Sequence, residues 1–211
     1  TYSEPNGLGS FQLDWAFPVF DRDILTLCGV SEILAHDSAE GPHVSAATDS
    51  IAYSLDQGVL TIHARDGDDT IRIRTAANGR IRLERVSREP NNGPWHTDPV
   101  VLLSGVTSIN ADLRGGRDTF VMDAGLPMPA AVSGGDGDDM ISTGSGNDDV
   151  SGDGGADRIT TGAGDDRAHG GEGDDVIDSG AGNDTVFGAG GNDRLDAGDD
   201  DDEVHGGAGI A

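Results

Sequence analysis

Residues 134–142 read Gly-Gly-Asp-Gly-Asp-Asp-Met-Ile-Ser, and seven more copies of this nine-residue unit follow without an insertion up to His205. The shared pattern is G-G-x-G-x-D-x-U-x, where U is a large apolar residue, and a ninth copy starts at Gly206. Repetition at a fixed short period predicts a solenoid in which each coil stacks on the one before it. The sixth position is aspartate in every complete copy: Asp139, Asp148, Asp157, Asp166, Asp175, Asp184, Asp193 and Asp202.

Each position of the unit has a mechanical role. Glycine at the first, second and fourth positions allows backbone angles that other residues avoid, so the chain can turn tightly and direct carbonyl oxygens inward. The last three residues form a minimal strand whose middle side chain points into the core. The expected core residues are Ile141, Val150, Ile159, Ala168, Ile177, Val186, Leu195 and Val204.

A second period is present within the first. At position one, glycine alternates with a small non-glycine residue, as in Gly134, Thr143, Gly152 and Thr161. The structural unit is therefore predicted to be 18 residues, which form two turns and two short strands. Carboxylates 18 residues apart should then meet between neighbouring coils, in six pairs: Asp139–Asp157, Asp157–Asp175, Asp175–Asp193, Asp148–Asp166, Asp166–Asp184 and Asp184–Asp202.

Calcium is the ion that such pairs suit. It is a hard cation that accepts six to eight oxygens in a flexible shell of carboxylates and backbone carbonyls, whereas magnesium demands a strict octahedron. Zinc would require Cys or His ligands, and the repeats contain no Cys and few His. We expect about six calcium ions, bound by the sixth-position aspartates and by carbonyls of the turn glycines Gly135, Gly137, Gly144, Gly146, Gly155, Gly162, Gly164, Gly171, Gly173, Gly180, Gly182 and Gly191.

Residues 134–211 resemble the RTX (repeats-in-toxin) β-roll modules of secreted bacterial proteins. The resemblance implies a right-handed parallel β-roll that holds calcium in its turns. It also implies a secreted, extracellular or cell-surface location. The repeats depart from the pattern where Asp153 and Ala189 replace the second glycine and Asp200 replaces the fourth. The site that uses Asp202 lies beside the acidic run 199–202 and is the least regular of the set.

Charge makes a bound cation necessary for this fold. The chain has a net charge of −26, and residues 134–211 hold 21 acidic residues against three arginines. One aliphatic core residue per nine cannot offset an ordering cost of about 1–2 kcal/mol per residue at roughly 25 cal/mol per Å² of buried apolar surface. Folding and cation binding should therefore be one event. The negative surface also argues against nucleic-acid partners and against insertion into a membrane.

Residues 51–133 read as irregular coils of the same solenoid. Strands are predicted at 59–62, 70–73, 81–83, 100–103 and 119–122, from β-branched residues and alternation. Two degenerate copies of the repeat lie here, one with Asp69 and one with Asp118 at the sixth position. Either aspartate could bind calcium or serve only to shape its turn. The whole chain is thus expected to be an all-β, parallel β-solenoid whose irregular N-terminal coils tighten into a β-roll at residue 134.

Residues 1–50 have a different composition, because five of the nine aromatic residues of the chain fall there. We expect this segment to form an N-terminal cap or a docking arm, since the end of a solenoid exposes core and strand edge. The last repeat has no capping segment after it, so the aromatic segment of one copy could cover the last coil of another and build a filament. Cys28 is the sole cysteine and cannot form an intramolecular disulfide.

Catalytic motifs are absent from the sequence: there is no H-E-x-x-H, no G-x-S-x-G and no P-loop. The sequence therefore favours a non-catalytic, extracellular, calcium-binding structural module whose folding is driven by calcium, and which could assemble head to tail into a surface or matrix fibre. An alternative is the C-terminal secretion and folding module of a larger secreted enzyme, toxin or adhesin. A passive calcium buffer is a third interpretation, and it predicts neither assembly nor a ligand.

Overall fold

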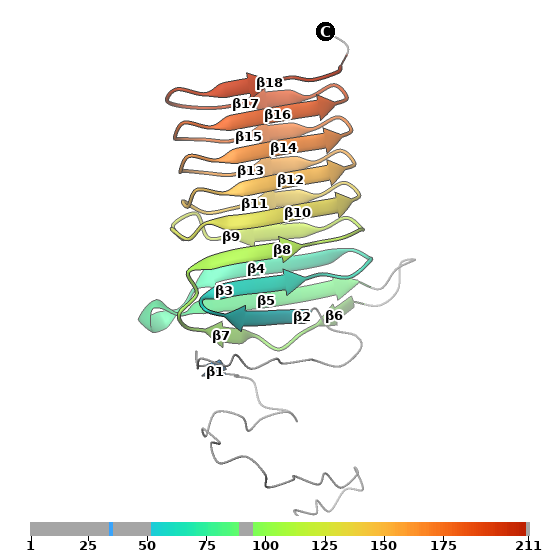
Figure 1. Cartoon of the computed structure of the whole chain (residues 1–211). Coiled ribbons are helices and arrows are strands. Elements are labelled where there is room, and N and C mark those ends of the chain that lie inside the picture. Colours follow the sequence, from blue (N-terminus) through green and yellow to red (C-terminus); the bar gives the residue numbers. More distant parts are fainter. Residues whose placement is uncertain (1–33, 36–51, 89–94, 210–211) are drawn as a thin grey trace, which may run out of the picture.

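A computed structural model describes residues 34–35, 52–88 and 95–209 of the chain. Within these ranges the protein is all-β. It consists of strands and loops with a single 3-10 turn at Ala77–Gly79, and it contains no α-helix. The strands stack along one axis into a β-solenoid with two sheets (Figure 1). No helix in the described part is long and apolar enough to cross a membrane.

Nine strands form the regular part of the solenoid. In one sheet β11, β13, β15 and β17 follow one another, and in the other β10, β12, β14, β16 and β18 do. Every neighbouring pair is parallel with a register of 18 residues, as in Ile141↔Ile159 and Val150↔Ala168, which confirms the predicted two-turn unit. The strand bounds are β10 Ala130–Asp136, β11 Met140–Ser142, β12 Asp149–Gly154, β13 Arg158–Thr160, β14 Arg167–Glu172, β15 Val176–Asp178, β16 Thr185–Gly190, β17 Arg194–Asp196 and β18 Glu203–His205.

The core of this part is a single file of side chains from each sheet. The expected inward residues from Ile141 to Val186 are all buried, Ala168 included. Burial weakens at the last two strands, because Leu195 is only partly buried and Val204 is 49% exposed. The apolar pattern of the repeats thus identified the core correctly from Ile141 to Val186, whereas the prediction that Val204 is a core residue was wrong.

The five strands predicted in residues 51–133 are all present, with small shifts at their ends. Sequence reasoning missed β2 and β6 in this region, as well as β8. β3 runs parallel to β8 and β4 runs parallel to β9, so these coils continue the two sheets of the regular part. The bounds are β2 Ala52–Asp56, β3 Val59–His63, β4 Asp69–Thr75, β5 Ile81–Arg88, β6 Trp95–Thr97, β7 Val101–Leu103, β8 Ser108–Asp112 and β9 Thr119–Met122.

Two hairpins interrupt the parallel order that the sequence led us to expect here. β2 pairs with β3 in an antiparallel sense through a turn in which Gln57 and Gly58 have φ of 47° and 85°. β4 pairs with β5 in the same sense through a turn that contains Asn78 and Gly79, with φ of 62° and 70°. Positive φ at two consecutive residues is the geometry that suits a tight hairpin. Hairpins therefore connect these strands where a solenoid would have full coils. β5 also pairs in an antiparallel sense with β6 and β7.

The predicted cap or docking segment at residues 1–50 lies outside the described residues, except for β1 (Leu34–Ala35). β1 pairs with β7 in a parallel sense. Cys28 and the aromatic residues of that segment are likewise outside the described part. At the other boundary, β10 runs across residue 134, so the sheet continues from the irregular coils into the repeats without a break.

The alternation at position one has a physical cause in the turns. On one side of the solenoid, a Cβ on Gly134 or Gly152 would overlap the Oδ2 atom of the sixth-position aspartate of the same copy. On the other side there is room for a side chain: the Thr143 hydroxyl donates to the carbonyl of Thr161 at 3.0 Å, and the Thr161 hydroxyl donates to that of Ser179 at 3.0 Å. The two sides therefore differ in chemistry as well as in position.

This packing predicts different costs for two glycine substitutions at the same position of the repeat. Gly152→Ala would push a Cβ against Asp157 Oδ2 and into the carbonyl of Gly170, so we expect it to destabilise the fold by about 1–3 kcal/mol, as overpacking does. Gly206→Ala is the matched control, because nothing lies within 4 Å of its Cβ, and it should change stability by less than about 0.5 kcal/mol. Denaturant unfolding in one calcium-containing buffer measures both, and equal effects would contradict the packing argument.

Candidate metal-binding turns

The sixth-position aspartates form two columns, one along each side of the solenoid. The first column contains Asp139, Asp157, Asp175 and Asp193, and the second contains Asp148, Asp166, Asp184 and Asp202. Seven of the eight carboxylates accept, on Oδ1, a hydrogen bond from the backbone N–H of the residue 18 positions earlier, at 2.7–3.0 Å. The eighth, Asp139, accepts the N–H of Asp118, 21 positions earlier. The predicted pairs are therefore brought together, and one carboxylate oxygen of each aspartate closes the contact between coils.

In seven of these eight aspartates, all but Asp202, the second carboxylate oxygen is buried without a hydrogen-bond partner. Six of the eight aspartates are only 1–3% exposed. A buried carboxylate oxygen with no donor is costly unless a cation neutralises it. The Oδ2 atoms in this state belong to Asp118, Asp139, Asp148, Asp157, Asp166, Asp175, Asp184 and Asp193.

The carbonyls of the fourth-position glycines stack on one another along each side of the solenoid. Six fourth-position glycines, from Gly137 to Gly191, have φ between 129° and 134°, a region that favours glycine. The carbonyl of such a glycine occupies the space that a Cβ would need on the equivalent glycine one coil later. The carbonyl of Gly137, for example, lies directly beneath Gly155. Among the second-position glycines, the carbonyls of Gly144, Gly162 and Gly180 already accept backbone hydrogen bonds from the coil above. Of the predicted carbonyl ligands, these three second-position carbonyls are therefore the less available to an ion.

The turn at residues 143–147 differs from the others in what lies beneath it. Gly144 and Gly146 lack the positive φ of their equivalents and pack on the carbonyl of Leu126 and on Met128. Position 130, one coil below Asp148, is an alanine whose N–H donates to Asp148 Oδ1 at 2.8 Å. The second column therefore begins at Asp148, with no carboxylate below it.

The departures from the repeat pattern keep the backbone geometry of the glycines that they replace. Asp153, Ala189 and Asp200 all adopt positive φ, of 71°, 75° and 87°. Aspartate tolerates this region better than alanine does, so Ala189 is the most strained of the three. Asp202, in the last turn, accepts the N–H of Asp184 at 2.9 Å but is more exposed than the aspartates below it.

The chemistry of these turns limits how a metal could be held. Across residues 52–88 and 95–209, no group of three or more His, Cys, Asp or Glu side chains is arranged to bind a metal ion. An ion in a turn would therefore have two carboxylates at most and would take its other ligands from backbone carbonyls. Such an all-oxygen shell suits calcium.

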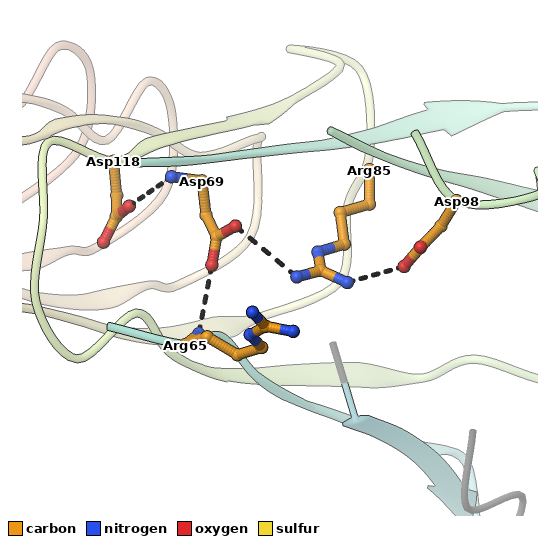
Figure 2. Close-up of polar contacts among 5 residues, drawn as sticks. All are labelled: Arg65, Asp69, Arg85, Asp98 and Asp118. Atoms are coloured by element: carbon orange, nitrogen blue, oxygen red, sulfur yellow. Dashed lines mark hydrogen bonds and ion pairs between the residues drawn. The ribbon is translucent and has the colours of Figure 1, made fainter. Parts of the chain in front are cut away.

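The two degenerate copies continue the first column below the repeats. Asp69 N–H donates to Asp118 Oδ1 at 2.7 Å, and Asp118 N–H donates to Asp139 Oδ1 at 2.8 Å. Asp69 is also 3.5 Å from the guanidinium of Arg85, which contacts Asp98 at 2.6 Å (Figure 2). Sequence reasoning identified both aspartates but missed Arg85, because no local pattern shows that β5 folds back beside β4.

Burial raises the pKa of several aspartates in the two columns. Loss of solvation raises the pKa of Asp118 to about 8 and that of Asp139 to about 7, and neighbouring carboxylates add to the rise. The same causes raise the pKa of Asp166 and Asp175 to about 6. Hydrogen bonds from backbone N–H groups oppose the shift but do not cancel it. Without a cation, the pKa values of Asp118 and Asp139 leave these two carboxyl groups largely or half protonated at neutral pH, whereas Asp166 and Asp175 lose their protons at about pH 6.

These shifts predict that the metal-free chain loses structure as pH rises. Because the pKa values are higher in the folded state than the usual 3.8, the folded chain binds more protons than the unfolded chain between about pH 4 and pH 8. The stability from protonation is complete at the acidic end and disappears as pH passes through 6 to 8. Circular dichroism in calcium-free buffer should therefore show more β-structure at pH 5 than at pH 8.

A neutral substitution separates this effect from the general charge of the chain. The double variant Asp118→Asn, Asp139→Asn should retain more structure than the wild type in calcium-free buffer at pH 8, because asparagine mimics the protonated acid. Asp149→Asn is the control, since Asp149 is exposed on β12. A metal-free wild type that gains structure from pH 5 to pH 8 would contradict the interpretation.

Comparison with known families assigns the repeat segment. The model of the RTX calcium-binding nonapeptide repeat matches residues 132–159, 151–186 and 180–210. The search of curated proteins and the search of solved structures found no match. The matched residues coincide with the coils whose aspartates leave one oxygen buried and unpaired, so residues 132–210 are a β-roll of RTX calcium-binding nonapeptide repeats.

Proposed function

We propose that this chain is a non-catalytic, extracellular structural module that folds around calcium ions held between successive coils. The observation that carries the proposal is the set of buried, unpartnered Oδ2 atoms along both columns. Six ions would occupy the six aspartate pairs of the repeats, with fourth-position carbonyls completing their shells. The repeats themselves are a calcium-binding structural unit, and the proposal extends this character to the whole chain.

The energetics favour a switch between the inside and the outside of a cell. Extracellular calcium modules bind with dissociation constants of about 10⁻⁴ to 10⁻³ M. At a free calcium concentration tenfold above the dissociation constant, each site adds about 1.4 kcal/mol to stability, so six sites add on the order of 8 kcal/mol. That sum matches the stability of a typical domain. At micromolar calcium the same sites add almost nothing, so secretion into a calcium-rich medium would trigger folding.

Calcium titration of the purified chain tests the proposal. We expect circular dichroism at pH 7.5 to change from disordered to β-rich as calcium rises to about 1 mM, and chelator to reverse the change. Asp157→Asn should weaken the folded state by about 3 kcal/mol at saturating calcium, because Asp157 belongs to two aspartate pairs and each site adds about 1.4 kcal/mol. Asp149→Asn, on the exposed face of β12, should behave as the wild type. A spectrum that calcium and chelator leave unchanged would refute the proposal.

A second candidate function, assembly into a fibre, is favoured by the β18 end of the described structure. Among the described residues β18 pairs with β16 alone, and Val204 on it is 49% exposed. An unpaired strand edge beside an open core can template the pairing of another chain. If a different surface of a second copy covers this end, the contact repeats and produces an open filament.

Assembly into a fibre predicts that the mass of the particles in solution increases when calcium is added. Light scattering at rising protein concentration should show polymers in 1 mM calcium and monomers in chelator. Val204→Glu should suppress the polymers while it leaves calcium-induced folding intact, because the side chain at this position is half exposed. Met140→Glu serves as the control for surface charge, because it adds the same charge at an apolar side chain of similar exposure (48%) on β11, away from β18. A wild type that remains monomeric at high concentration in calcium would exclude assembly of this chain alone.

A further inference from the structure

The first aspartate column extends below the family-matched repeats without a change in geometry. The hydrogen bonds that link Asp69 to Asp118 and Asp118 to Asp139, at 2.7 and 2.8 Å, match the 2.8 Å bond that links Asp139 to Asp157. The sequence separations are 49 and 21 residues, because β5, β6, β7 and β8 lie between Asp69 and Asp118 in the chain, and a loop and β10 lie between β9 and Asp139. Asp118 is therefore a structural equivalent of the repeat aspartates.

The pair Asp118 and Asp139 presents the same free oxygens as the pairs within the repeats. Both Oδ2 atoms are buried without a hydrogen-bond partner, and the two residues are 2% and 3% exposed. Gly116 has φ of 138°, and its carbonyl lies where a Cβ on Gly137 would be, as that of Gly137 lies beneath Gly155. The oxygens that a cation would contact are thus all present one coil below the first nonapeptide.

Asp69 is in a different state, because its two oxygens already have partners. Oδ2 accepts the backbone N–H of Arg65 at 3.0 Å, and Oδ1 lies 3.5 Å from a guanidinium nitrogen of Arg85. Arg85 is buried, with 4% of its side chain exposed, and it bridges Asp69 and Asp98 (Figure 2). A divalent cation beside this guanidinium would meet both charge repulsion and a carboxylate that is already engaged.

We propose that a further calcium site lies between Asp118 and Asp139, outside the nonapeptide repeats, and that the column ends at Asp69, where the Arg85 guanidinium takes the place of a metal ion. This inference rests on the proposed calcium-dependent function. It predicts seven calcium ions for the chain, four in the first column and three in the second. It also defines where the metal-dependent part of the solenoid begins.

Calcium stoichiometry measured by native mass spectrometry and equilibrium dialysis tests the proposal. Asp118→Asn should bind one ion fewer than the wild type, and Asp69→Asn should bind as many as the wild type. Asp139→Asn should lose two ions, because Asp139 is shared between two sites. Asp148→Asn is the matched comparison and should lose one ion, since Ala130 and not an aspartate lies below Asp148.

The comparison of Asp139→Asn with Asp148→Asn is informative even if Asp118→Asn folds poorly. Equal losses would show that the first column starts at Asp139, which would overturn the proposal. An unchanged stoichiometry for Asp118→Asn would overturn it as well. The loss of an ion in Asp69→Asn would show that Arg85 does not replace a metal. A wild type that binds no calcium would refute the proposed function itself, whereas a wild type with six ions would refute only the additional site.

Discussion

The structure depends on how each sixth-position aspartate divides its two oxygens. One oxygen accepts a backbone N–H from the coil below and fixes the spacing of the stack, at 2.7–3.0 Å. In seven of the eight aspartates, the other oxygen is buried without a hydrogen-bond partner. The same side chain therefore links neighbouring coils and places an unneutralised negative charge between them, which a bound cation would neutralise. Neither hydrogen bonds nor burial can satisfy both oxygens within this geometry.

The remaining features of the repeats follow from that constraint. Glycine at position one is required on the side where a Cβ would overlap the free oxygen, while threonine or serine is accepted on the other side. The aliphatic core has one side chain per nine residues, too little to pack a domain by itself. Protons and cations compete for the same oxygens, which is why burial raises the pKa of Asp139 and Asp166 toward or into the neutral range.

The sequence predicted the parts of the fold that repeat and missed the parts that do not. Period, register, aspartate pairs and the core residues from Ile141 to Val186 could be read from the repeats, because each copy reports on the same local geometry. The exposure of Val204 could not, because it depends on what packs beyond β18. The hairpins at Gln57–Gly58 and Asn78–Gly79 were missed, since alternation identifies a strand but not the direction of its partner. Arg85 was missed for a related reason: its contact with Asp69 depends on the antiparallel return of β5, which no motif encodes.

The two halves of the described solenoid differ in what neutralises their buried carboxylates. The lower coils bury large side chains such as Leu60, Ile62 and Phe120, and Arg85 supplies the positive charge that Asp69 and Asp98 require. The upper coils replace most of that apolar surface with glycine and aspartate, and their counter-charge has to come from solution. A chain-borne cation is present at any calcium concentration, whereas a bound ion is present only where calcium is abundant. If the proposed sites bind calcium, the point along the stack between Asp69 and Asp118 therefore separates coils that the chain's own arginine stabilises from coils that ions from the medium stabilise.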